Sequence, residues 1–255
     1  MRSIRSERCQ DAAGMHEAGA SSSATATSPI AAHPSSPRTA PRLLAGGILA
    51  GPVFLVTALI EGVTRAGFSF ARNAISLLSL GSLGWIQDLN FMVTGLLATL
   101  CAAGMRRALR GGPGGTWGPL LVGAFGVATI LAGIFHPDPS GGFPPGTPPG
   151  NPAHISVHGA GHIISATLGF VCLAAAAFVL ARRFSRAGQR NWAVYSRASG
   201  ALALAGAIAA GASVLAFLPG IVIGFTWLAA TSAHLYNGGG SPHQTAPHAA
   251  GEAAR

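Results

Sequence analysis

The stretch WGPLLVGAFGVATILAGIF, residues 117–135, decides the fold class because it is apolar throughout and carries no charged residue. A helix needs roughly 20 such residues to cross the hydrocarbon core of a membrane. The loop that follows, residues 136–157, begins His136-Pro137-Asp138-Pro139 and is rich in proline and glycine. Together they predict a membrane-spanning helix that ends in a polar loop.

The composition of the whole chain agrees with a protein that crosses the membrane several times. The 255 residues are 49% hydrophobic and only 9% charged, whereas soluble domains carry roughly 25% charged residues. The net charge of +9 comes from arginine, since the chain contains no lysine. The arginines flank apolar stretches, which argues against nucleic-acid binding, and arginine without lysine is typical of GC-rich bacterial genomes.

Six membrane-spanning helices are predicted, which makes the expected fold an all-α membrane bundle. The fourth helix is expected to begin with Asn151 as its N-cap and Pro152 as its first residue. The last two share the nearly uncharged stretch 199–236, with a turn near Pro219; five helices plus a re-entrant segment is the alternative. The expected spans are residues 43–60, 85–105, 117–135, 152–181 and two within 199–236.

Two polar tails flank the predicted bundle, which covers residues 41–236. Residues 1–40 are rich in Ser, Ala, Thr and Pro and lack the apolar region of a signal peptide. Residues 237–255 are rich in Gly, Pro and His. Neither tail has enough apolar surface to offset the entropy lost on ordering, so we expect both to be disordered.

The distribution of arginine predicts which side of the membrane each loop faces. Ten arginines belong to one set of helix ends, whereas Arg65 and Arg72 belong to the other. Because arginine-rich loops stay in the cytoplasm, we expect both termini there, with segments 61–88 and 136–158 facing outward from the cytoplasmic membrane. The ten are Arg38, Arg42, Arg106, Arg107, Arg110, Arg182, Arg183, Arg186, Arg190 and Arg197.

Segment 62–83 alternates between polar and apolar residues and is predicted to contain a short amphipathic helix at the membrane interface. Arg72, Ser76 and Ser79 would lie on one face of that helix. The apolar residues between them would face the bundle or the lipid.

The predicted outward rim gathers the acidic residues of the bundle. The chain has seven acidic residues, and the three outside the tails, Glu61, Asp88 and Asp138, all map to this rim. Ionisable groups near a membrane are costly, so they are candidates for function. We predict a ligand-binding site made of Glu61, Arg65, Arg72, Ser76, Gln87, Asp88, Asn90, His136 and Asp138.

Three histidines, His154, His158 and His162, are spaced four residues apart and would lie on one helix face. Two imidazoles one turn apart can bind Zn²⁺ together with a carboxylate. We predict His158, His162 and Asp138 as the ligands of such a site, with another acid of the rim as the alternative carboxylate. Hydrogen bonds to loop carbonyls or helix caps are the competing explanation.

The charged residues of the rim also have a structural interpretation. Ion pairs between its acids and Arg65 or Arg72 would hold segment 62–83 against the helix ends. Alternatively, the two arginines would bind a lipid headgroup or a small anion, and a buried Glu61 or Asp88 would act as an acid or base.

Serine catalysis is disfavoured because no GxSxG motif is present. Haem is disfavoured because it needs histidines on facing helices at the same depth in the membrane. The only other histidine in a predicted span, His234, lies at the opposite end.

Short motifs occur in both halves of the rim and in the spans between them: Gly51-Pro52, residues 76–81, residues 84–87, Asn90-Phe91, residues 95–97, Asp138-Pro139, residues 142–146, His158-Gly159 and His162. Together they resemble a family of bacterial integral membrane proteins, domain of unknown function 998 (DUF 998). The resemblance covers about residues 45–236. It implies about six transmembrane helices and supplies no activity.

Three classes of function follow from these patterns. The first, which we favour, is a non-enzymatic membrane protein that binds membrane lipid, a small ligand or a protein partner through the rim. The second is a metal-dependent membrane hydrolase that uses His158, His162 and a carboxylate. The third is a small transporter, which the scarcity of polar residues in mid-span and the lack of an inverted repeat disfavour.

Overall fold

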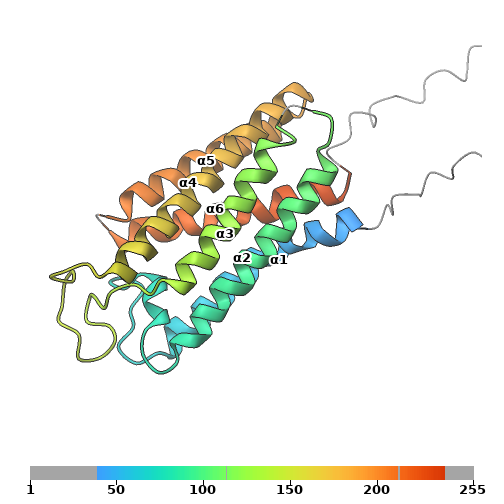
Figure 1. The fold of residues 1–255 in the computed structure, drawn as a ribbon. Coiled ribbons are helices and arrows are strands. Elements are labelled where there is room, and N and C mark those ends of the chain that lie inside the picture. The colour runs from blue at the N-terminus through green and yellow to red at the C-terminus, as the bar shows by residue number, and fades with distance from the viewer. Residues whose placement is uncertain (1–38, 113, 212, 239–255) are drawn as a thin grey trace, which may run out of the picture. The chain divides into compact units, whose positions relative to one another are not determined.

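The structure, a computed structural model, describes residues 39–112, 114–211 and 213–238 (Figure 1). Nearly all of the two predicted tails lies outside these residues. In the described part of the chain, every regular element is a helix. The elements are α1 (Thr39–Thr64), the 3₁₀ helix η1 (Ile75–Ser79), α2 (Gly84–Ala108), α3 (Trp117–Ile134), α4 (Val157–Arg186), α5 (Arg190–Ala209) and α6 (Val214–Tyr236).

The six α-helices confirm the predicted all-α membrane fold. Five of them are long and apolar enough to cross a membrane, and α5 falls outside this group. Helix α5 nevertheless runs the length of the bundle. Just before α5, Oε1 of Gln189 lies 3.0 Å from Nε2 of His234, near the end of α6. Just after α5, Ala210 lines a cavity together with Asp138 at the opposite end.

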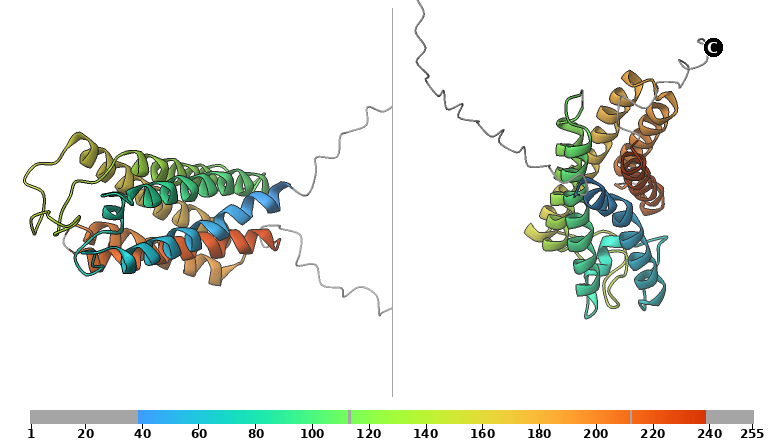
Figure 2. Two further views of the ribbon diagram at one scale, coloured as in Figure 1. Left: turned by 90° about the horizontal axis from the view of Figure 1, so that it is seen from below. Right: turned by 90° about the vertical axis from the view of Figure 1, so that its right-hand side faces the viewer.

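Each α-helix packs against its neighbours in the chain, and α6 also packs against α1, so the six helices form a closed ring (Figures 1 and 2). Small residues let the helices approach closely, as is common in membranes. A Cβ atom added to Gly95 of α2 would lie 2.5 Å from the carbonyl oxygen of Gly126 in α3. Aromatic rings fill the middle of the ring, where Phe54 stacks on Phe225 with centroids 5.0 Å apart.

Helix α4 begins at Val157, so the predicted start at Pro152 is wrong. The N-cap is Ser156, whose Oγ accepts a hydrogen bond from the Gly159 amide at 2.9 Å. The amide of Ser156 in turn donates to Oδ2 of Asp138 at 2.9 Å. These two bonds satisfy donors at the helix start, and they leave Asn151 and His154 in the preceding loop.

The turn predicted near Pro219 lies instead between Ala209 and Val214. Pro219 is inside α6, and the glycine after it has a packing role. A Cβ atom added to Gly206 of α5 would lie 2.8 Å from the Cα atom of Gly220. The close contact between α5 and α6 therefore explains a Pro-Gly pair that otherwise indicates a turn.

The predicted amphipathic helix in segment 62–83 is the five-residue η1, which packs on α1 and α2. Its apolar side chains Ile75, Leu77 and Leu78 are buried. The expected single polar face is not kept, because Ser79 is buried whereas Arg72 precedes the helix and is exposed.

The two ends of the ring differ in character. Figure 2 shows the segment before α2 and the loop before α4 together at one end, which we call the loop end. We call the opposite end the arginine end. The described members of the predicted arginine group lie at or near it: Arg42, Arg106, Arg107, Arg110, Arg182, Arg183, Arg186, Arg190 and Arg197. Arg38 lies outside the described residues.

Candidate functional site

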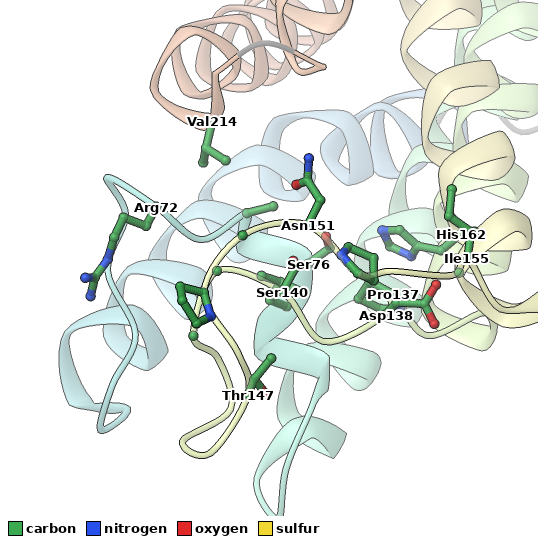
Figure 3. A pocket seen from close by; sticks show the side chains of 18 of the residues that line it. Arg72, Ser76, Pro137, Asp138, Ser140, Thr147, Asn151, Ile155, His162 and Val214 are labelled. Carbon is green, nitrogen blue, oxygen red and sulfur yellow. The ribbon is translucent and has the colours of Figure 1, made fainter.

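A cavity of about 970 Å³ lies at the loop end (Figure 3). Its walls come from the segment around η1, the loop before α4, the first turns of α4 and the connection between α5 and α6. Four predicted site residues line it: Arg72, Ser76, Asp138 and His162. The remaining predicted residues lie elsewhere: Glu61, Arg65, Gln87, Asp88, Asn90, His136 and His158.

The lining of this cavity also contains apolar side chains, which lie on different sides of it: in Figure 3, Val214 is on the side of Arg72 and Ile155 is beside His162. Ile163 of α4 and Val214 of α6 line it together with Ile155 of the loop. Ile163 is 52% exposed although it lies on a helix long and apolar enough to cross a membrane. The cavity therefore combines polar groups of the loop with apolar side chains of the helices.

The loop that forms the polar walls is held in place by Asn73, which the sequence-based prediction of the site did not include. Its Nδ2 donates to the carbonyl of Gly141 at 3.0 Å, and its Oδ1 accepts from the Ser69 amide at 2.9 Å. The side chain is fully buried. An asparagine within an otherwise half-apolar segment is the sequence signal that could have pointed to this position.

Glu61 and Arg65 form a buried ion pair at the end of α1, with Nη1 and Oε1 3.1 Å apart. Arg65 also donates to the carbonyls of Leu78 and Leu80, and its guanidinium lies 5.4 Å from the ring centroid of Phe143. These contacts match the structural interpretation of the rim charges. Arg65 holds η1 and the loop against α1.

Gln87 and Asn90 lie inside the bundle, where they join α2 to α1. Asn90 Nδ2 donates to Oε1 of Gln87 and to the carbonyl of Phe54, both at 3.1 Å. Several buried polar atoms of α1, η1 and α2 have no partner among the described residues, and such atoms commonly bind ordered water. They are Glu61 Oε2, Ser79 Oγ, Gln87 Nε2 and Asp88 Oδ1.

His136, Asp88 and His158 form a more exposed group. His136 Nε2 lies 3.1 Å from Oδ2 of Asp88, and the two side chains are 46% and 27% exposed. The rings of His136 and His158 stack with centroids 6.3 Å apart. The pair between α2 and the loop is therefore accessible from outside the bundle.

His162 is buried and caps α3. Its Nδ1 lies 2.8 Å from the carbonyl of Ala132 and 2.9 Å from that of Phe135. Carbonyls only accept, so Nδ1 carries the proton. This geometry matches the competing explanation for the histidines. Within the described residues, no three His, Cys, Asp or Glu side chains are grouped to hold a metal ion. Zinc binding by His158, His162 and Asp138 stays a prediction.

Asp138 belongs to the loop before α4, and its carboxylate lies beside the N-terminus of that helix. Hydrogen bonds from the side chain and the backbone amide of Ser156 hold the pKa of Asp138 below its ordinary value. The carboxylate is therefore ionised at neutral pH. It provides the cavity with a negative charge that is fixed to a helix end.

Comparison with known families links the cavity to a described family. A family model described as a protein of unknown function (DUF998) matches residues 48–234. The matched stretch includes most of α1, all of α2 to α5, most of α6 and every residue of the cavity. Comparisons with curated proteins and with solved structures found no match.

Proposed function

This chain belongs to the DUF998 family, whose function is unknown, and on that premise we propose a function from the geometry of the loop end. The protein is a multi-pass integral membrane protein. We propose that the cavity at the loop end binds the headgroup of a membrane lipid. The observation that carries this proposal is the combination of polar loop groups and apolar helix side chains in the lining of one cavity.

The size and lining of the cavity support an amphiphilic ligand. Its volume of about 970 Å³ is within the range of roughly 300–1,000 Å³ typical of ligand pockets. Ser76, Ser140 and Asn151 supply neutral polar groups on the loop side. Ile163 and Val214 supply apolar contacts on the helix side, where a lipid chain would lie.

The charges of the cavity favour a zwitterionic headgroup. Arg72 and Asp138 both belong to its lining, and Figure 3 places them on opposite sides, with the side chain of Arg72 extended away from the other labelled residues. The carboxylate of Asp138 suits an ammonium group, and a guanidinium suits a phosphate. Phosphoethanolamine carries both groups.

The orientation of the protein is part of the proposal. The arginine end faces the cytoplasm by the positive-inside rule, so the cavity faces outward from the cytoplasmic membrane. A membrane-impermeant thiol reagent tests this orientation on Thr147→Cys in intact cells, with Cys9 of the N-terminal tail replaced by serine so that it cannot react. Labelling only after the cells are broken would contradict it.

The test of lipid binding compares two neighbouring residues of α4. Ile163 lines the cavity, whereas Ile164 is 65% exposed and does not line it. Purified full-length protein is titrated with short-chain phosphatidylethanolamine. We expect Ile163→Trp to weaken binding about tenfold or more, because the indole fills space in the cavity, a change of roughly 1.4 kcal/mol. Ile164→Trp is expected to bind as the wild type does.

Free phosphoethanolamine separates a lipid site from a site for a small soluble molecule. If it binds as tightly as the lipid, the apolar side chains of the cavity contribute nothing and the lipid proposal is wrong. Equal lipid binding by the Ile163→Trp and Ile164→Trp variants would contradict the proposed location. The metal-dependent hydrolase and the transporter stay predictions.

A further inference from the structure

A groove between α4 and α5 at the arginine end combines two guanidinium groups with apolar side chains. Its volume is about 610 Å³, and it shares no residue with the cavity at the loop end. The groove is lined by Phe178 and Arg182 of α4 and by Val194, Arg197, Ala198 and Ala201 of α5.

The two arginines lie about one and two helical turns inside the helix ends. Arg182 precedes the last residue of α4, Arg186, by about 6 Å, and Arg197 follows the first residue of α5, Arg190, by about 10 Å, at about 1.5 Å per residue. The deeper guanidinium reaches outward, because Nη2 of Arg197 donates to Oγ of Ser185 at 3.2 Å. Arginines near a membrane surface extend in this way toward the headgroups.

The arginine end offers these groups no acidic side chain within the described residues. The described acids, Glu61, Asp88 and Asp138, all lie at the loop end. Arg182 and Arg197 are both exposed. An anion from the surroundings therefore matches their charge, and phosphate suits the planar guanidinium because it accepts paired hydrogen bonds.

The rest of the groove suits a hydrocarbon chain. Val194 is 54% exposed and Phe178 is 36% exposed, so both face the surroundings of the bundle. Ala198 and Ala201 are small and leave room between the helices. Ala201 lies one turn beyond Arg197 toward the middle of α5, so the apolar strip continues from the guanidinium groups into the span.

We propose that this groove binds one anionic phospholipid, with its phosphate between Arg182 and Arg197 and an acyl chain along the apolar strip. In the orientation proposed above, the groove faces the cytoplasmic leaflet. Anionic lipids are abundant in such leaflets, and basic sites between helices bind them. The lipid would contact α4 and α5 together. Such a contact would hold α5 against α4 in the membrane, where α5 is less apolar than the five helices that are long and apolar enough to cross it.

The test measures phosphatidylglycerol binding to the full-length protein in detergent, by native mass spectrometry and by the midpoint of thermal unfolding. The double variant Arg182→Gln/Arg197→Gln is expected to bind this lipid about tenfold or more weakly, because two charge-assisted hydrogen bonds are lost. Ala198→Trp fills the groove without changing charge and is expected to weaken binding similarly. Arg107→Gln/Arg110→Gln, which removes equal charge outside the groove, is the matched control.

Each result either supports the groove or overturns it. Selective loss in the double variant and in Ala198→Trp, with the control unchanged, supports the proposal. Equal loss in the control would show that net charge alone attracts the lipid. Soluble glycerol phosphate that raises the unfolding midpoint as much as the lipid would overturn the acyl-chain contact. If the double variant fails to fold, Ala198→Trp decides the outcome because it keeps both arginines.

Discussion

The loop end and the arginine end both carry charged side chains beside the membrane, but they hold them differently. At the loop end, Arg65 pairs with Glu61 and bonds two carbonyls, and Asp88 pairs with His136. At the arginine end, the described part of the chain has bases without acids. Charge at the loop end therefore joins segments of the protein to one another, whereas Arg182 and Arg197 at the arginine end expose their charge to the surroundings.

This difference predicts that substitutions at the two ends have different consequences. A change of a charged residue at the loop end removes contacts inside the fold and lowers its stability. A comparable change at the arginine end alters lipid contacts and leaves the fold largely intact. Variants at three positions of the loop end, taken from the largest expected effect to the smallest, test this contrast.

The largest effect is expected for Arg65→Ala. The substitution leaves Glu61, whose side chain is 5% exposed, as a buried carboxylate without its cation. Breaking a buried ion pair in this way costs about 3–5 kcal/mol of the free energy of unfolding. Thermal unfolding in detergent measures the change. Arg107→Ala at the arginine end is the control, with an expected change within about 0.5 kcal/mol.

A second variant identifies the cause of that loss. In Glu61→Ala/Arg65→Ala the stranded carboxylate is gone, so the double variant is expected to lose less stability than Arg65→Ala does alone. A double variant that is less stable than Arg65→Ala would mean that the unpaired carboxylate is not the main cause.

The next largest effect is expected at His162. His162→Phe keeps a ring but removes the Nδ1 donor from the carbonyls of Ala132 and Phe135, which is expected to cost about 1–3 kcal/mol. His158 is exposed, so His158→Phe is expected to change the free energy of unfolding by less than about 0.5 kcal/mol. Thermal unfolding of both variants gives the comparison.

The same pair of variants tests the zinc prediction. A site formed by both histidines would lose its metal in either variant, whereas a capping role for His162 affects stability in one variant only. Metal analysis of the purified wild type and of both variants distinguishes these cases. Parallel loss of zinc and stability in both variants would favour the metal site.

The smallest effect concerns pH. The pKa of Asp138 is lowered in the folded protein, so its bonds to Ser156 stabilise the fold above the unfolded pKa of about 3.9. This contribution is lost as the pH falls through the folded pKa. The midpoints of wild type and Asp138→Asn should therefore differ at neutral pH and converge in acid. A difference that persists unchanged in acid would contradict this assignment.

The helices of the bundle could be predicted from the sequence, because a long apolar stretch in a membrane must satisfy its backbone hydrogen bonds internally and so forms a helix. It failed at Pro152 and Pro219, where local signals were outweighed by contacts with distant residues. The start of α4 is set by the hydrogen bond from Ser156 to Asp138, and Gly220 is needed for close packing against Gly206. Both contacts join residues far apart in the chain, so a local sequence pattern does not predict them.

The candidate site was predicted in part. The rim residues Arg72, Ser76 and Asp138 do line one cavity. Charge alone could not separate them from Glu61 and Arg65, because an ion pair that fastens a loop and a site that binds a ligand use the same side chains. The backbone walls of the cavity carry no residue-type signal, so the glycines and prolines of the loop indicated only that it is irregular.

The closure of the ring by α6 has a consequence for synthesis in the cell. Helices enter the membrane in chain order, so α1 to α5 meet their neighbours as they emerge. The face of α1 around Phe54 lacks its packing partner until α6 is made, because the ring of Phe225 in α6 stacks on the Phe54 ring with centroids 5.0 Å apart. In a nascent chain, α1 and α5 therefore lack the helix that joins them until α6 is inserted. We expect a separately synthesised α6 to pack between α1 and α5 of the remaining five helices.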